Sequence, residues 1–282
     1  MEHRRPAALA AAALAFAALL ALPAGPAAAQ IASVTIDGNP ASAEISLPGG
    51  IAADLTITFE QAVGLTAANL GLDAELVSAS DLTLLSRLPE LASIPTGFPV
   101  LVTIEPPETG GLSFSGMATV GLYTHNLMYT AGTPLRLFSA PVGGAFRDVT
   151  DEVSSGSYRV RGAKGDFSEF LIVADVRGVD TVIGEKFGRT EDLLDEHWSA
   201  IGSTLASQLD THLGNARTAW EGGQTVSALS HVESFLKKLE QASSSDLPDV
   251  WRSARDLDNV EGLLRAAGET LHFSLTLKRT GL

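Results

Sequence analysis

The chain has 282 residues, a formal net charge of −14 and no cysteine, and 45% of its residues are hydrophobic. A chain of this length and composition can form two hydrophobic cores. Its acidic balance argues against nucleic acid and anionic membranes as partners. The lack of cysteine excludes disulfides, thiolate metal sites and cysteine catalysis.

The N-terminal segment has the pattern of a secretory signal peptide. Arg4 and Arg5 form a basic n-region, an apolar run covers residues 7–22, and Ala27–Ala29 supply small residues before a cut. A retained membrane anchor is the alternative, but it needs about 20 apolar residues. We therefore expect residues 1–29 to be removed and the mature protein to be periplasmic or extracellular, without a membrane span.

Residues 30–177 have the alternating hydrophobicity of β-strands. The alternation is clear over residues 31–47, 55–60 and 113–123, and segments containing glycine or proline separate the runs. Phe167–Ala174 is the clearest buried strand, since β-branched and aromatic residues follow one another there. About eight to ten strands without an intervening long helix predict an antiparallel β-sandwich.

The apolar period changes to three or four residues after the predicted sandwich. We expect a linker at 178–189, a bundle of three or four helices at 190–274, and a C-terminal tail at 275–282. The expected N-caps are Thr190, Thr225 and Asp246. The predicted fold class is thus α+β, a sandwich followed by a helical bundle.

Three tryptophans fall on the helical apolar stripes, namely Trp198, Trp220 and Trp251. They could form a platform for sugar stacking, but their spacing favours packing in the helical core.

The helical part resembles the FIMAH-type module of exported bacterial proteins over residues 209–271. A leucine-rich opening leads through Ala216 and Arg217 to a turn at Gly222–Gly223, and Phe235 follows in the next helix. The resemblance implies an extracellular accessory or binding module without catalytic residues. The whole chain also resembles uncharacterised exported bacterial proteins, which implies no function.

Asp166-Phe167-Ser168 resembles the cleavage strand of autoproteolytic β domains of the GAIN and nucleoporin types. Those domains cut themselves before the hydroxyl residue of a His-Phe-Ser or His-Leu-Thr triplet. The resemblance implies a cut between Phe167 and Ser168, with Ser168 Oγ as nucleophile and position 166 as base. Aspartate replaces histidine here, and a carboxyl with a pKa of about 4 is a poor base unless burial raises that pKa. The alternative is a serine that simply packs in a strand.

Two other groups of polar residues are candidates for a site. Asp148, Asp151 and Glu152 lie in a predicted turn and could bind calcium through their oxygens, although Asx-type hydrogen bonds would also explain them. His125 and Asn126 follow a predicted strand, where a packing or capping role is the alternative to catalysis. The sequence contains no G-x-S-x-G elbow and no H-E-x-x-H motif.

These observations predict a non-catalytic binding, adhesion or assembly module of the bacterial envelope. We expect no cofactor, and as partner another envelope or extracellular protein or a glycan. The alternative function is an autoproteolytic β domain cleaving before Ser168.

Overall fold

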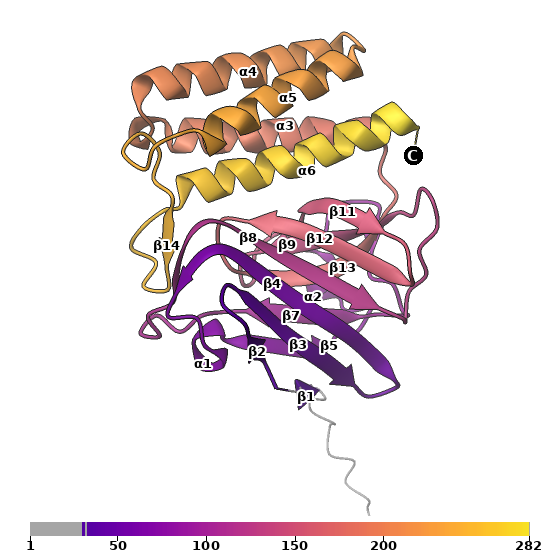
Figure 1. The fold of residues 1–282 in the computed structure, drawn as a ribbon. Helices are drawn as coiled ribbons and strands as arrows, with labels where there is room; N and C mark the ends of the chain where they lie inside the picture. The colour runs from indigo at the N-terminus through magenta and orange to yellow at the C-terminus, as the bar shows by residue number, and fades with distance from the viewer. Residues whose placement is uncertain (1–29, 32, 282) are drawn as a thin grey trace, which may run out of the picture.

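The computed structural model describes residues 30–31 and 33–281 of the chain. The predicted signal peptide lies outside these residues. Two antiparallel sheets form a sandwich, and four long helices lie on one side of it (Figure 1). The predicted α+β class, with a sandwich followed by helices, is confirmed.

The first sheet has the strand order β1-β3-β4-β8-β12-β11, with β2 beside β3 and β14 beside β8. Every second side chain is buried along β3 and most of β4, so one face of these strands packs on the core and the other faces water. The strands are β1 (Gln30–Ile31), β2 (Thr35–Ile36), β3 (Pro40–Leu47), β4 (Ile51–Val63), β8 (Ser113–Thr124), β11 (Thr150–Ser154), β12 (Tyr158–Lys164) and β14 (Val250–Arg252).

The second sheet has the order β10-β9-β13-β7-β5, with β6 beside β13. Five consecutive residues of β13 are buried, because one face packs in the sandwich and the segment around α2 covers the other. The strong apolar run therefore marks a strand buried on both faces. The elements are α1 (Ala67–Leu70), β5 (Leu72–Leu76), α2 (Leu82–Leu85), β6 (Ala92–Ser93), β7 (Val100–Ile104), β9 (Leu135–Ala140), β10 (Arg147–Asp148) and β13 (Glu169–Asp175).

The helices form two layers above the first sheet (Figure 1). Helix α6 packs directly on β8, β11 and β12 and lies beside α3, whereas α4 and α5 pack on each other in the outer layer. The helices are α3 (Val179–Glu196), α4 (Ser203–Glu221), α5 (Thr225–Glu240) and α6 (Val260–Thr280), with a 3-10 turn at Trp198–Ala200.

The helix boundaries differ from the predicted ones at both ends of the bundle. The expected linker 178–189 forms the first half of α3, where Ile183 and Phe187 are buried four residues apart. Thr190 is consequently inside a helix, and its hydroxyl donates to the Lys186 carbonyl instead of capping. The expected tail 275–282 begins within α6.

The third predicted helix is wrong at its start, because β14 occupies residues that should have been helical. β12 pairs with β8 only from Ala118 onward, which leaves Ser113–Ser115 free to pair with β14. Trp251 on β14 enters the sandwich core, where its ring lies 5.4 Å from that of Phe114. The C-terminal part of the chain thus completes the N-terminal core.

The other two tryptophans differ in their surroundings. Trp220 stacks on Phe187 between helices, with ring centroids 5.4 Å apart. Trp198 lies in the 3-10 turn and is 39% exposed, so its predicted core position is wrong.

Asn259 fixes the beginning of α6 to the first sheet. Its Nδ2 donates to the carbonyls of Gly116, 2.7 Å away, and Gly165, 3.2 Å away, while its Oδ1 accepts from Gly262 N. The backbones are so close that a Cβ at Gly165 would lie 2.3 Å from Leu263 N. Both the glycine and the amide are therefore needed for this contact.

We predict that Asn259→Asp destabilises the protein by about 2–4 kcal/mol, because two buried carbonyls lose their donor and face a carboxylate. The free energy of unfolding in urea measures the effect. Asn215→Asp on the exposed side of α4 is the matched control. Equal stability of the two variants would contradict the proposed contact.

Candidate functional site

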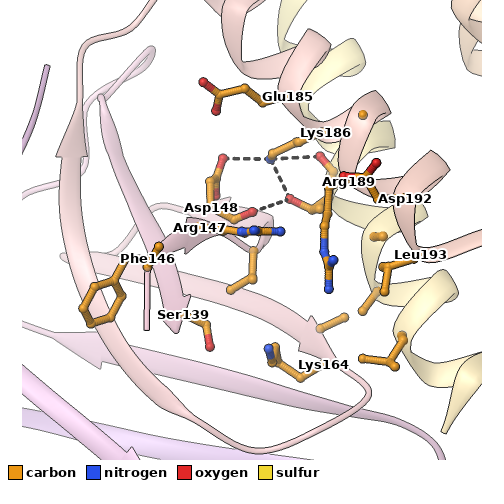
Figure 2. A pocket seen from close by; sticks show the side chains of 18 of the residues that line it. Ser139, Phe146, Arg147, Asp148, Lys164, Glu185, Lys186, Arg189, Asp192 and Leu193 are labelled. Atoms are coloured by element: carbon orange, nitrogen blue, oxygen red, sulfur yellow. Dashed lines mark hydrogen bonds and ion pairs between the residues drawn. The ribbon is translucent and has the colours of Figure 1, made fainter. Parts of the chain in front are cut away.

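A cavity of about 570 Å³ lies where the sandwich meets the inner helix layer. We call it the sheet–helix cavity. β9, β10, the end of β12, α3 and α6 all contribute to its lining (Figure 2). Its volume falls in the range of about 300–1,000 Å³ that is common for ligand pockets.

Two arginines in the cavity form no ion pair among the described residues, although the carboxylates of Asp166, Asp192 and Glu196 favour the charged form of Arg189 from a longer distance. Arg147 projects from β10 and Arg189 from α3, and their side chains point toward one another in Figure 2. Among the residues that the structure describes, neither forms an ion pair or a hydrogen bond. Burial lowers the pKa of Arg189, and the positive charge of Arg147 lowers it further. Arg147 is exposed to solvent and Arg189 is half-buried, so the cavity presents two cationic groups that water can reach.

Ser139 adds an unsatisfied hydroxyl to the same lining. It is only 3% exposed, and its Oγ has no hydrogen-bond partner among the described residues. Most buried polar atoms in proteins are paired, so an unpaired one in a cavity wall is available to a ligand.

The charge of the lining differs in sign from that of the whole chain. Five cationic and four anionic side chains line the cavity, a balance of +1, whereas the chain carries −14. The cations are Arg147, Lys164, Arg177, Lys186 and Arg189, and the anions are Asp148, Asp166, Glu185 and Asp192.

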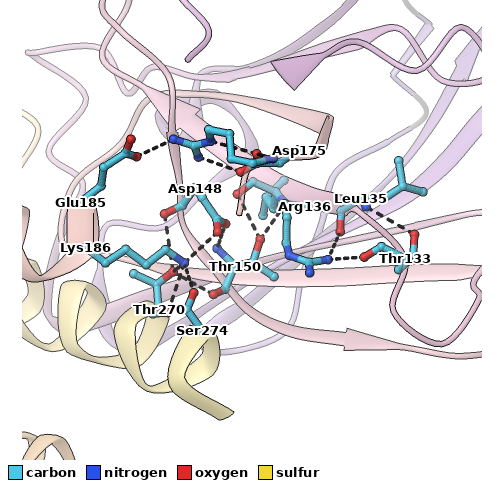
Figure 3. Close-up of polar contacts among 12 residues, drawn as sticks. Thr133, Leu135, Arg136, Asp148, Thr150, Asp175, Glu185, Lys186, Thr270 and Ser274 are labelled. Atoms are coloured by element: carbon cyan, nitrogen blue, oxygen red, sulfur yellow. Dashed lines mark hydrogen bonds and ion pairs between the residues drawn. The ribbon is translucent and has the colours of Figure 1, made fainter. Parts of the chain in front are cut away.

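A buried ion pair joins α3 to β10 at the border of the cavity (Figure 3). Lys186 Nζ lies 2.7 Å from Asp148 Oδ2, and the two side chains are 7% and 4% exposed. The ammonium also donates to Thr270 Oγ1, Thr270 O and Ser274 Oγ on α6, at 2.6, 3.1 and 2.9 Å. All of its hydrogens are thus used within the protein.

Thr150 extends this network into the sheet. Its backbone N donates to Asp148 Oδ1 at 2.9 Å, and its Oγ1 accepts from Leu137 N at 2.8 Å. Thr270 Oγ1 in turn donates to the Thr150 carbonyl at 2.9 Å. The network therefore connects β9, the β10–β11 segment, α3 and α6.

The pair changes the ionisation of both its members. Burial favours a raised pKa for Asp148, but the charge of Lys186 and the hydrogen bonds from Lys186 and Thr150 outweigh it and lower the pKa below the ordinary 3.8. Burial lowers the pKa of Lys186, and Asp148 opposes that change. Asp148 therefore stays ionised at neutral pH and provides the counter-charge for the ammonium.

The residues predicted for self-cleavage do not form a catalytic arrangement. Asp166 Oδ1 lies 2.8 Å from Lys164 Nζ, and no described residue makes a hydrogen bond to the buried Ser168 Oγ. The 167–168 peptide is trans, and neither residue has a positive φ. Phe167 packs against Phe59 and Phe114. This geometry agrees with the alternative of a serine packed in the core.

The three carboxylates predicted for calcium are each paired with a cation. Asp148 is bound by Lys186, while Asp151 and Glu152 each lie 2.9 Å from Arg161. Within residues 30–31 and 33–281, no three acidic, histidine or cysteine side chains gather as a metal site would require. The structure therefore does not bring the three together as ligands.

His125 and Asn126 lie at the end of β8, outside the cavity lining. The two ring nitrogens of His125 are 2.8 Å from Tyr123 Oη and 2.7 Å from Ser157 Oγ. Asn126 Oδ1 accepts from Ala52 N at 2.9 Å. These contacts connect neighbouring hairpin ends, as the packing alternative predicts.

Sequence reasoning identified Asp148 and Asp166, but for other chemistry, and missed Arg147, Arg189, Lys186 and Ser139. The sequence does contain one indication that Lys186 is buried. It follows Ile183 by three residues and so falls on the buried stripe of α3, where a lysine requires a partner. The predicted linker at 178–189 concealed that stripe.

A model for a family of unknown function, DUF6689, matches residues 17–279. The chain belongs to this family. The match covers the sandwich and the helices together and includes neither a FIMAH-type nor a GAIN-type domain. No curated protein matches the sequence. Among the helices of residues 33–281, none has the length and apolarity needed to cross a membrane.

We predict that the pKa of Asp148 lies below 3.8 in the native protein and rises above that value in Lys186→Met, since burial then acts without the ammonium. A ¹³C NMR titration of the carboxyl measures both. With the folded pKa below the unfolded one, the carboxylate adds stability above about pH 4 that is lost as the pH falls through the folded pKa.

The same variant should lose about 3–5 kcal/mol of stability at pH 7, because it leaves a buried carboxylate unpaired. Lys237→Met, on the exposed face of α5, is the control. An unchanged Asp148 titration in Lys186→Met would contradict the assigned pair.

Proposed function

We propose that this protein is an exported, non-catalytic binding protein and that the sheet–helix cavity receives the anionic group of its ligand. The observation that carries the proposal is the presence in one cavity of Arg147 and Arg189, neither of which forms an ion pair among the described residues. Export is expected from the pattern of residues 1–29.

The excess of acidic side chains in the chain, set beside two arginines that form no ion pair, supports an anionic ligand. The chain has 33 acidic and 19 basic side chains, so counter-ions for arginine are plentiful. Arg147 and Arg189 nevertheless form no ion pair among the described residues, and an entering anion would place a counter-charge beside both guanidiniums. Guanidinium groups also bind carboxylate and phosphate oxygens with paired, charge-assisted hydrogen bonds.

The state of the other polar groups supports binding rather than catalysis. Lys186 is held by Asp148, Thr270 and Ser274, so its ammonium is not available as a base or nucleophile. Ser139 has no base in contact with its hydroxyl among the described residues. The resemblance of residues 209–271 to FIMAH-type accessory modules stays a prediction. Binding to an envelope protein or a glycan stays a prediction, as does cleavage before Ser168.

Calorimetric titration with benzoate and with its uncharged isostere benzamide tests the proposal. We expect benzoate to bind and benzamide to bind at least about tenfold more weakly, because only the anion neutralises the arginines. The double variant Arg147→Gln/Arg189→Gln should lose the preference. Arg279→Gln, an exposed arginine at the end of α6, should keep it.

Three results would contradict the proposal. They are equal affinity for benzoate and benzamide, unchanged benzoate binding by the double variant, and no binding of benzoate by the wild-type protein.

A further inference from the structure

Gly188 is placed where packing does not require a glycine. It lies in the interior of α3 and lines the sheet–helix cavity, and no atom lies within 4 Å of the position that a Cβ would take. Glycine destabilises a helix interior relative to alanine. Since a methyl group would meet nothing there, the effect of the glycine is to leave space on the cavity side of the helix.

Part of the cavity wall is aliphatic, although the acidic residues Glu185 and Asp192 lie three residues before and four residues after Gly188 on α3. Leu193 lies four residues after Arg189, so the two side chains are neighbours on one face of α3. Leu263 and Ala266 face the cavity from α6, and both are only partly buried although they belong to a helix that packs on the sheet. The cavity therefore has a cationic part and an apolar part side by side.

We infer that the ligand is an amphipathic oxyanion, with one carboxylate or phosphate group and an aliphatic or aromatic body. The inference rests on the proposed function and adds the class of ligand. The anionic group binds Arg147 and Arg189 and accepts from Ser139 Oγ. The body lies against Leu193, Leu263 and Ala266, in the space left by Gly188.

Charge and volume both limit the ligand to this class. A lining balance of +1 favours a ligand with one anionic group over a ligand with several. The volume of about 570 Å³ is much larger than an isolated carboxylate needs, which leaves room for a ligand body.

Titration of the purified protein with matched probes tests the inference. The probes are acetate and octanoate, inorganic phosphate and octyl phosphate, and 1-octanol. We expect octanoate or octyl phosphate to bind at least about tenfold more tightly than its short counterpart, because the alkyl chain is removed from water. If the gain in affinity appears between acetate and octanoate, the anionic group is a carboxylate, and if it appears between inorganic phosphate and octyl phosphate, the group is a phosphate. Octanol should bind more weakly than either long anion.

Two variants fill the apolar part without touching the arginines. Gly188→Leu on α3 and Ala266→Leu on α6 should each reduce the affinity for the long anion at least about tenfold. Gly214→Leu is the matched control, because Gly214 is also a helix-interior glycine with no atom within 4 Å of a Cβ, but it lies on α4 outside the cavity. The Gly214→Leu variant should bind the long anion as tightly as the wild type does, although its helix gains the same leucine side chain.

The outcomes separate this inference from the proposed function. If short and long anions bind equally well, the apolar part plays no role and the inference is overturned, although an anion site stands. If both filling variants keep wild-type affinity, the location of the body is overturned. If octanol binds as tightly as the long anions, or if no anion binds, the proposed function fails and the inference fails with it.

Discussion

The buried contact between Asp148 and Lys186 is the interaction on which the rest of the structure depends. Removing two charges from water is costly, and the cost is offset only when geometry and further hydrogen bonds are favourable. Here Thr150, Thr270 and Ser274 supply those bonds from the sheet and from α6. The pair therefore holds two helices and the β10–β11 segment in one relative position, and the cavity lies along this junction.

The chemistry of the cavity follows from which charges are neutralised within the protein. Lys186 is paired with Asp148, Lys164 with Asp166, and Arg177 with Asp175 and Glu185. Arg147 and Arg189 remain without a partner among the described residues, in a chain that is acidic overall. The anion binding that we propose would thus use charges that the fold does not use for its own stability.

Local patterns predicted the fold well where neighbouring residues decide it. The alternation in β3 and β4, the apolar run of β13 and the stripes of α4 and α5 all correspond to the observed elements. The pattern was insufficient for β14, because these three residues become a strand only by pairing with the edge of β8 that β12 leaves open, over 130 residues away in sequence. The site was harder, since Asp148 and Lys186 are identified as partners only once α3 is placed on the sheet.

The buried junction should make the sandwich and the helices one cooperative unit. Native-state hydrogen exchange of the purified protein tests it most directly, because each amide reports the free energy of the opening that exposes it. We expect the slowest amides of β8 and β9 and those of α3 and α6 to share one free energy of opening and one dependence on denaturant. Helical amides that open together at a clearly lower free energy, while the sheets stay protected, would contradict it.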